Sequence, residues 1–152
     1  DWYQADVVVG SKRHPVSQVE YPLIRKILSF CYQKLVWTLF GLTIRDTQAG
    51  LKVFRREVLE KVMPRLLVKD YAIDIEILAV ANRLGFKRIY EAPIKINHPF
   101  GSLTQRSITT LILKMLKDTL AVFYRLKIVH YYDDGHERQW VYDPELQMRI
   151  NL

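Results

Sequence analysis

The sequence predicts an α/β fold. Three observations support this prediction: a β-branched apolar run closes on glycine at Asp6 to Gly10, two later segments alternate as strands, and segments with helical apolar spacing lie between them. The order strand, helix, strand, helix, strand is typical of a sheet covered by helices. With 152 residues and 49% hydrophobic content, the chain is long enough to bury one core.

The first part of the chain predicts a strand, a long helix and a second strand. Asp6 to Gly10 has the pattern of a buried strand that ends in a tight turn, and a polar, basic loop follows. Pro22 suits a helix first turn, and the apolar spacing from there to Phe40 predicts a helix, with Gly41 as its C-terminal stop. Residues 51–54 then alternate as a strand.

The next segments predict two further helices and a third strand. Residues 56–62 have the pattern of a short helix, and Asp70 suits the N-cap of a helix over residues 71–84. Residues 88–96 return to a strand pattern. Because Pro93 has no N–H to donate to a ladder, this strand is expected at a sheet edge or at a bulge.

A second long helix is predicted from Ser107 to about Val129. At 100° per residue its polar side chains form one stripe roughly 100° wide, and nearly everything else is apolar. The stripe holds Ser107, Thr110, Lys114, Lys117, Asp118, Ala121 and Arg125. Such a helix must bury most of its circumference, whereas residues 133–152 form a polar tail with no clear period.

The charge balance favours anionic partners. Lys and Arg number 23 against 16 Asp and Glu, a formal charge of +7, which suits nucleic acid, phosphorylated ligands or an acidic membrane surface. The single Cys31 cannot form a disulfide within the chain, and the four histidines lack metal-ligand spacing, so no metal site is predicted. No window of about 18 residues is free of charge, so no membrane span is expected.

One candidate phosphate site lies on the first long helix. Arg25 and Ser29 are four residues apart and share a face, and the basic loop with Lys12 and Arg13 lies near them if strand and helix pack as neighbours. Guanidinium and hydroxyl groups both donate to phosphate oxygens. A solvated helix face beside a loop that happens to be basic explains the same spacing.

Acidic residues give two weaker candidates. Asp46 lies at a turn before Gly50 and a strand, where site residues often occur, although an ordinary Asx-turn explains it equally well. Asp74 and Glu76 lie early in a helix, where the macrodipole favours acidic residues in any case. Since they are two residues apart, they point to different faces and do not form a paired-carboxylate site.

Taken together, five blocks in order make the chain resemble the family-two glycosyltransferases that act on polyprenyl phosphates, the dolichyl-phosphate mannose synthase type. The blocks fall between about Ala5 and Ser102. They are Asp6-Val7-Val8-Val9-Gly10-Ser11-Lys12, Arg25-Lys26-Ile27-Leu28-Ser29, Asp46-Thr47-Gln48-Ala49-Gly50-Leu51-Lys52-Val53-Phe54, Tyr71-Ala72-Ile73-Asp74-Ile75-Glu76-Ile77-Leu78 and Glu91-Ala92-Pro93-Ile94.

The resemblance implies a Rossmann-like domain of the GT-A type, present here in part. It assigns residues 1–102 to the acceptor half of that domain, 103–132 to an amphipathic interfacial helix and 133–152 to the tail. In the family, an Asp-x-Asp motif in the N-terminal half holds the nucleotide sugar and a divalent metal, Mg²⁺ or Mn²⁺. No such motif occurs in this chain. The chain is therefore expected to be inactive alone.

The resemblance also implies roles for individual residues. Lys12, Arg25 and Ser29 match positions that bind the acceptor phosphate, and Asp46 matches an aspartate discussed as a catalytic base. Because a phosphate monoester is already ionised at neutral pH, we expect Asp46 to orient Arg25, Lys12 or a sugar hydroxyl rather than to remove a proton.

Five further residues are possible site residues: Arg13, Gln48, Asp74, Glu76 and His98. The chain departs from the family after the Glu-x-Pro-Ile strand, where an arginine is usual and Asn97 and His98 stand instead. His98 or Arg106 is a candidate substitute for it. The departure leaves the chemistry of the acceptor loop open.

The 107–129 helix suits a membrane surface. Residues 103–132 carry five Lys or Arg and one Asp, a net charge of +4, which contributes on the order of 4 kcal/mol near an anionic leaflet at about 1 kcal/mol per charge. Lys114, Lys117 and Arg125 are the expected membrane contacts, on the cytoplasmic face of the membrane. Packing of this helix on the sheet is the other interpretation.

The predicted function is glycosyl transfer from a nucleotide sugar to a dolichyl or undecaprenyl phosphate, with this chain as the acceptor side. A non-catalytic basic module that binds membranes or nucleic acid is the alternative. Nucleic acid is disfavoured because no recognisable binding module and no regular interleaving of aromatic residues is present. A degenerate, regulatory piece of the transferase fold is a third possibility.

Overall fold

The computed structural model describes residues 4–17, 23–68, 72–95, 108–135, 140–144 and 148–151. The predicted combination of sheet and helices is confirmed. In chain order the elements are β1 (Val7–Ser11), α1 (Leu23–Phe40), β2 (Lys52–Phe54), α2 (Arg56–Val62), the 3₁₀ helix η2 (Met63–Arg65), α3 (Ile73–Arg83), β3 (Ile89–Pro93), α4 (Ile108–Lys127), β4 (Trp140–Asp143) and β5 (Met148–Asn151).

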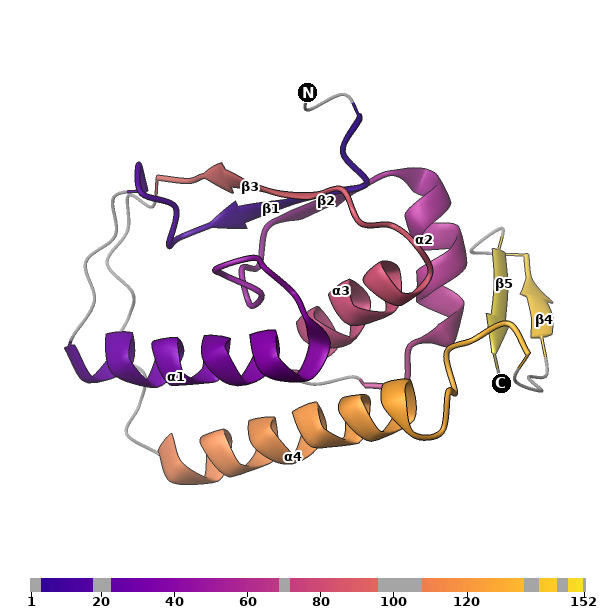
Figure 1. Ribbon diagram of the computed structural model, residues 1–152. Helices are drawn as coiled ribbons and strands as arrows, with labels where there is room; N and C mark the ends of the chain where they lie inside the picture. The colour runs from indigo at the N-terminus through magenta and orange to yellow at the C-terminus, as the bar shows by residue number, and fades with distance from the viewer. Residues whose placement is uncertain are drawn as a thin grey trace.

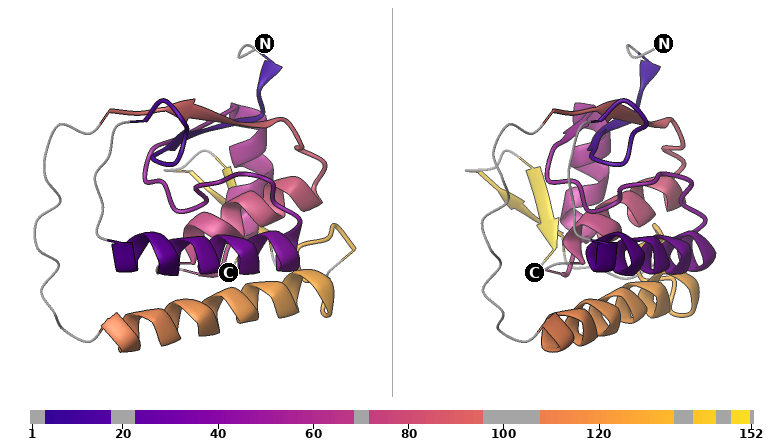
Figure 2. Two further views of the ribbon diagram at one scale, coloured as in Figure 1. Left: turned by 60° about the vertical axis from the view of Figure 1, so that its left-hand side comes forward. Right: turned by 90° about the vertical axis from the view of Figure 1, so that its left-hand side faces the viewer.

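The main sheet is mixed and has the order β2-β1-β3. The central strand β1 runs antiparallel to β2 and parallel to β3. The edge position of β3 agrees with the expectation from Pro93, which cannot donate to a further strand. The sheet forms one layer, α2 and α3 lie against it, and α1 and α4 run side by side on the side away from the sheet (Figures 1 and 2).

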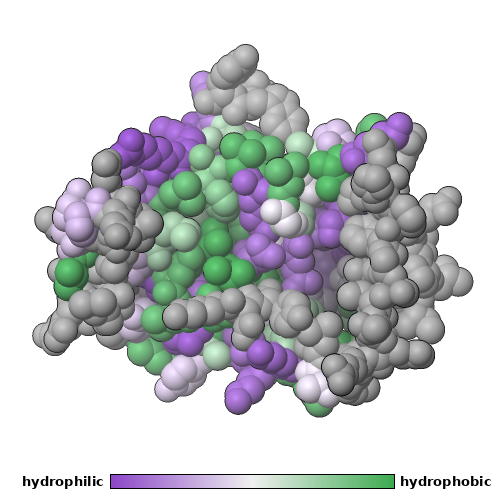
Figure 3. Space-filling view, turned by 180° about the vertical axis from the view of Figure 1, so that it is seen from behind, coloured by the Kyte–Doolittle hydropathy of each residue, from purple (hydrophilic) through white to green (hydrophobic). Residues whose placement is uncertain are grey.

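The core lies between this sheet and the helices. The alternation of β1 turns the fully buried Val7 and Val9 toward the helices, while Val8 faces the other side and is only partly buried. From the helices, Val36, Val58, Ile75, Leu78 and Val122 complete the same cluster. Viewed from behind, a hydrophobic patch lies mainly left of the centre of the surface, and hydrophilic residues lie at the upper left edge, just right of the centre and along the lower edge (Figure 3).

Gly10 has a different role from the one the sequence suggests. The strand does not turn at Gly10 but continues to Ser11, and the Gly10 N–H donates to the Leu51 carbonyl at 2.9 Å. A Cβ at Gly10 would lie 2.9 Å from Cγ2 of Ile94 and 3.1 Å from Cδ2 of Leu51. Glycine is therefore required because side chains from both neighbouring strands cover this position.

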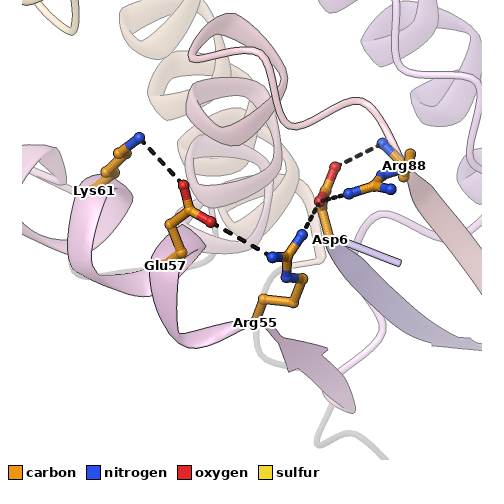
Figure 4. Close-up of polar contacts among 5 residues, drawn as sticks. All are labelled: Asp6, Arg55, Glu57, Lys61 and Arg88. Carbon is orange, nitrogen blue, oxygen red and sulfur yellow. Dashed lines mark hydrogen bonds and ion pairs between the residues drawn. The ribbon is translucent and has the colours of Figure 1, made fainter. Parts of the chain in front are cut away.

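A buried carboxylate joins the three strands at the start of β1. Asp6 accepts from the guanidinium of Arg88 at 3.1 Å and from that of Arg55 at 3.2 Å, and Arg55 also pairs with Glu57, which reaches Lys61 on α2 (Figure 4). Burial raises the pKa of Asp6, but the hydrogen bonds and positive charge of Arg88 and Arg55 outweigh it and hold the pKa below its ordinary value. This cluster closes one end of the sheet.

A polar contact and an aromatic contact join the helices α1 and α4. The hydroxyl groups of Tyr32 and Thr119 lie 2.7 Å apart, and the rings of Phe40 and Phe123 meet edge to face with centroids 6.2 Å apart. Burial raises the pKa of Tyr32 to about 12. Among the described residues, no helix has the length and apolar character needed to cross a membrane.

The predicted polar tail contains a β-hairpin. Strands β4 and β5 pair antiparallel, with Val141 opposite Ile150 and Tyr142 opposite Arg149. Trp140, Val141 and Tyr142 are strong β-formers. Because each strand has four residues, no period is long enough to be visible in the sequence.

Candidate functional site

The residues that follow β1 form a cluster with α1 and with the loop of residues 41–50. The Arg13 guanidinium donates to Ser29 Oγ on α1 at 2.6 Å, to Gln33 Oε1 on the same helix, and to the carbonyl oxygen of Arg45 at 3.3 Å. Ser29 and Gln33 share a helix face because they are four residues apart. We call these four residues the Arg13 cluster.

Asp46 and Glu91 shape the loop beside this cluster. The Asp46 carboxylate accepts the backbone N–H of Lys12 at 3.0 Å. One carboxylate oxygen of Glu91, on β3, accepts two successive backbone N–H groups, from Arg45 at 2.8 Å and from Asp46 at 3.1 Å. The end of β1, the loop and β3 are therefore tied together by carboxylates that accept from the backbone.

The site has a surplus of positive charge. Three cationic side chains, Lys12, Arg13 and Arg45, accompany the two carboxylates of Asp46 and Glu91, which leaves a net charge of +1. The Arg13 guanidinium donates to a hydroxyl, an amide and a carbonyl, which are neutral acceptors. An anionic ligand that displaced them would gain charge-assisted hydrogen bonds.

A pocket of about 230 Å³ adjoins the cluster. It lies between α1 and the loop and shares Gln33 and Arg45 with the Arg13 cluster. Its lining residues are Phe30, Gln33, Lys34, Trp37, Leu42, Thr43 and Arg45. The Lys34 ammonium lies 5.5 Å from the centre of the Phe30 ring and 5.3 Å from that of Trp37, so aromatic and cationic groups form one wall together.

The structure thus brings together Lys12, Arg13, Ser29 and Asp46 from the predicted set. Arg25 lies on α1, but its side chain is outside the described part, and so is the whole of His98. Gln48 lies on the same loop as Asp46, yet its side-chain amide donates to Met115 Sδ on α4 at 3.1 Å.

The other two predicted acidic residues have partners elsewhere in the fold. Asp74 pairs with Lys52 of β2 at 2.7 Å, a contact that joins α3 to the sheet. Glu76 is fully buried and accepts the backbone N–H groups of Leu67 at 3.1 Å and Val68 at 2.9 Å. Both carboxylates are therefore used in holding α3 in place.

Glu76 also joins α3 to the end of α4. It accepts a hydrogen bond from the hydroxyl of Tyr132, and Arg125 donates to the same hydroxyl at 3.1 Å and lies 3.7 Å from Glu76. Burial and the negative charge of Glu76 raise the pKa of Tyr132 well above its usual range. Arg125, a predicted membrane contact, thus contacts Tyr132 and Glu76 inside the protein.

Both helices of the outer pair expose apolar side chains. On α4, the exposed side chains of Leu113, Lys117, Leu120 and Tyr124 follow one another at spacings of three and four residues, and Lys114 is exposed next to them. Ile128, directly after the helix, continues this spacing and is also exposed. On α1, Ile27, Phe30 and Trp37 are each more than half exposed. The other side of α4, with Thr119, Val122 and Leu126, is buried. Helix α4 therefore packs on the protein along one stripe and leaves another stripe open.

A divalent cation has no ligand group within the described residues. No three of their His, Cys, Asp and Glu side chains gather in a way that could hold a metal ion. The carboxylates of the site, Asp46 and Glu91, accept hydrogen bonds from backbone N–H groups.

Sequence reasoning missed Gln33, Arg45 and Glu91. Gln33 follows Ser29 by one helical turn, so the spacing that identified Arg25 and Ser29 could have found it. Glu91 belongs to a block that carries the family resemblance, but nothing local indicates a contact with residues 45 and 46. Arg45 contributes its backbone carbonyl to Arg13, and a backbone role leaves no signal in residue identity.

Comparison with known proteins confirms the resemblance. The chain is 33% identical to the dolichyl-phosphate beta-glucosyltransferase of Saccharomyces cerevisiae over 120 residues, which cover 76% of the chain and 35% of that protein. It is 37% identical to a dolichyl-phosphate beta-glucosyltransferase of Trichomonas vaginalis over 123 residues, which cover 79% of the chain and 36% of that protein. The undecaprenyl-phosphate mannosyltransferase of Micrococcus luteus is 33% identical over 92 residues, 59% of the chain and 37% of that protein.

These relatives are named glycosyltransferases of polyprenyl phosphates, and the chain spans about a third of their length. No protein-family model matches the sequence, and no solved structure matches it at a significant level.

Proposed function

We propose that this chain, a homologue of part of the family-two polyprenyl-phosphate glycosyltransferases, binds the acceptor in the transfer of a glycosyl group from a nucleotide sugar to a polyprenyl phosphate. The observation that carries the proposal is the Arg13 cluster with its adjoining pocket, because cationic donors and an aromatic wall lie side by side. A polyprenyl phosphate has the matching pair of parts, an anion and an apolar chain.

The acceptor phosphate is assigned to Lys12, Arg13, Arg25 and Ser29. The fork of a guanidinium binds two phosphate oxygens at once, and a serine hydroxyl adds a third donor. The 2.6 Å contact between Arg13 and Ser29 supports the assignment, since it brings two such donors to one place.

Asp46 is assigned a positioning role. The nucleophile is an oxygen of a phosphate monoester, whose second pKa is about 6, so little deprotonation is needed at neutral pH. The hydrogen bond from the Lys12 backbone to Asp46 supports this role, because it holds the residue that precedes Arg13.

The first part of the prenyl chain is assigned to the pocket along α1. Phe30, Trp37 and Leu42 offer it apolar surface next to the phosphate donors. The exposed apolar stripes of α1 and α4 support contact with a membrane surface, from which such an acceptor is drawn. We assign this contact to the cytoplasmic face of the membrane, with Lys114 and Lys117 facing anionic headgroups.

The donor side is assigned to protein outside these 152 residues. Among the described residues, no group of His, Cys, Asp and Glu side chains could hold a divalent ion, so we assign no step to a metal held by them. In the proposal the sheet β2-β1-β3 is part of a GT-A type domain, and the 152 residues alone do not turn over.

A binding experiment tests the acceptor assignment. Isothermal titration of the full chain with farnesyl phosphate is expected to show binding that Arg13→Ala weakens by about tenfold to a hundredfold, since charge-assisted contacts to the phosphate are lost. Arg56→Ala is the matched control: it removes the same charge from an exposed arginine of α2 that pairs with Glu60. Equal affinities of the two variants for farnesyl phosphate would contradict the proposal, and binding of farnesol as tight as that of farnesyl phosphate would do the same.

Liposome flotation tests the membrane assignment. The double variant Lys114→Gln and Lys117→Gln is expected to lower binding to anionic vesicles by about tenfold or more, at about 1 kcal/mol per basic residue. Arg125 is left intact because its removal would disturb Tyr132 and Glu76. The control is the double variant Arg56→Gln and Lys61→Gln on α2, and identical flotation of both double variants argues against the assignment.

A further inference from the structure

We infer that Glu91 is a positioning residue of the acceptor site, which sets the direction of Lys12 and Arg13 through the 41–50 loop. The inference rests on the proposed function, since it concerns the same site. It assigns to Glu91 the task of shaping the 41–50 loop, and through that loop the segment after β1.

The first step is the contact between Glu91 and the loop. Glu91 pairs with Val9 in the parallel register of β3 and β1, and Val9 is fully buried on the helix side of the sheet. The Glu91 carboxylate reaches the loop on that side and accepts the N–H groups of Arg45 at 2.8 Å and Asp46 at 3.1 Å on one oxygen. Two successive N–H groups that converge on one anionic oxygen form a nest, and the charge strengthens both bonds.

The second step leads from the loop to the site. The carbonyl of Arg45 accepts from the Arg13 guanidinium at 3.3 Å, and the carboxylate of Asp46 accepts from the Lys12 N–H at 3.0 Å. The two residues that Glu91 fixes by their N–H groups thus both hold the segment after β1, together with Ser29 and Gln33 of α1. A shift of the loop moves both acceptors together.

The third step concerns what else could fix the loop. Residues 41–50 contain no helix or strand, so the regular hydrogen bonds of secondary structure do not hold them. The loop begins at Gly41, whose positive φ of 68° ends α1 and lets the chain reverse. Beyond that turn, the buried side chains of Leu42, Ile44 and Ala49 anchor the loop in the core. Glu91 supplies the contacts to the backbone N–H groups of residues 45 and 46, immediately beside the Arg13 cluster.

The substitutions at Glu91 separate its possible contributions. Glu91→Gln keeps the length and an oxygen that accepts both N–H groups, but it removes the charge. Glu91→Asp keeps the charge but withdraws it by one methylene group. Glu91→Ala removes the acceptor and leaves two N–H groups without it.

The first readout is the affinity of the full chain for farnesyl phosphate. We expect Glu91→Ala to weaken binding by about tenfold and Glu91→Gln by about threefold or less, because a neutral acceptor still holds the loop. Glu91→Asp is expected to resemble Glu91→Ala, and it replaces that variant where alanine prevents folding. Glu57→Ala, which removes an exposed carboxylate of α2, is the control and is expected to leave the affinity unchanged.

The second readout needs no ligand. Amide hydrogen exchange of Lys12 is expected to be faster by about tenfold in Glu91→Ala than in the wild type, while the core amide of Val9 keeps its protection. A merely structural role would speed exchange in β1 and at Lys12 alike. Unchanged Lys12 exchange in Glu91→Ala overturns the inference. If the wild type binds farnesyl phosphate and Glu91→Ala binds it equally well, the inference is overturned too. A wild type that binds no farnesyl phosphate refutes the proposed function, while the exchange result still decides the role of Glu91.

Discussion

The two ends of β1 carry similar residues in opposite arrangements. At its start, the carboxylate of Asp6 is buried and pairs with two arginines, so charge is neutralised inside the cluster. At its end, Arg13 is met by a hydroxyl, an amide and a carbonyl, while the nearby carboxylate of Asp46 accepts from the backbone. One cluster is a closed ion pair that stabilises the sheet, and the other keeps a cation among neutral partners, which an anionic ligand can replace.

The largest expected effect breaks the closed cluster. Asp6→Ala is predicted to lower the free energy of unfolding by about 2 kcal/mol, and Tm by about 4–8 °C, because both arginines lose their partner but remain half exposed to water. Thermal melting followed by circular dichroism measures the loss. Binding of farnesyl phosphate to the folded variant is expected to stay as in the wild type, and a variant of normal stability would contradict the assignment of this end to structure.

The same cluster predicts a dependence of stability on pH. Because the pKa of Asp6 is held below its unfolded value, its contribution is fully present above that unfolded value, near pH 4, and is lost as the pH falls through the lower, folded pKa. Unfolding by urea between pH 6 and about pH 2 measures this loss. In Asp6→Asn the acid-induced decrease is expected to be smaller than in the wild type.

The next largest effect is expected from a change of Arg13, in the cluster after the end of β1. Arg13→Lys keeps the charge but loses the fork that reaches Ser29 and Gln33 together. We expect it to bind farnesyl phosphate about tenfold more weakly than the wild type, with Tm nearly unchanged. Arg55→Lys is the matched change in the Asp6 cluster at the start of β1, and it is predicted to leave the affinity for farnesyl phosphate unchanged. If both lysine variants bind alike, the two ends do not differ in the way described.

The smallest effect concerns Asp46. Asn at this position still offers an oxygen to the Lys12 N–H, so Asp46→Asn is expected to weaken binding of farnesyl phosphate only by about threefold. In a transfer assay with the donor side supplied, Asp46→Asn should lower the rate without adding an acidic limb to the pH profile, because we assign no proton removal to Asp46. A new acidic limb would assign Asp46 the role of a base.

The order of the elements could be read from the sequence, because the local signals were strong. Gly41 and Gly85 both have positive φ and end their helices, as expected of glycines that follow helical spacing. Pro93 lies on an edge strand for the reason that its missing N–H implies. The β4–β5 hairpin escaped prediction because four-residue strands carry too short a pattern.

The site could be predicted only where its residues share a local spacing or a family block. Ser29 was found by its position on α1, and Arg13 by its place in a basic loop. Arg45 and Glu91 act through the backbone and across the sheet, and such contacts depend on the tertiary fold. Glu76 shows the converse, because the sequence left it as a possible site residue, whereas it accepts hydrogen bonds from Tyr132 and from the backbone N–H groups of Leu67 and Val68.

A map of where the acceptor binds tests most directly whether the Arg13 cluster and its pocket form the acceptor site. The full, ¹⁵N-labelled chain is titrated with farnesyl phosphate, and amide and indole signals are followed by NMR. If the acceptor binds at the Arg13 cluster, the shift changes concentrate at the amides of Arg13, Ser29 and Gln33 and at the indole of Trp37. Little change is expected at Asp6, Arg55 and Arg88. Shifts centred on the start of β1, or spread evenly over the basic surface, would contradict it.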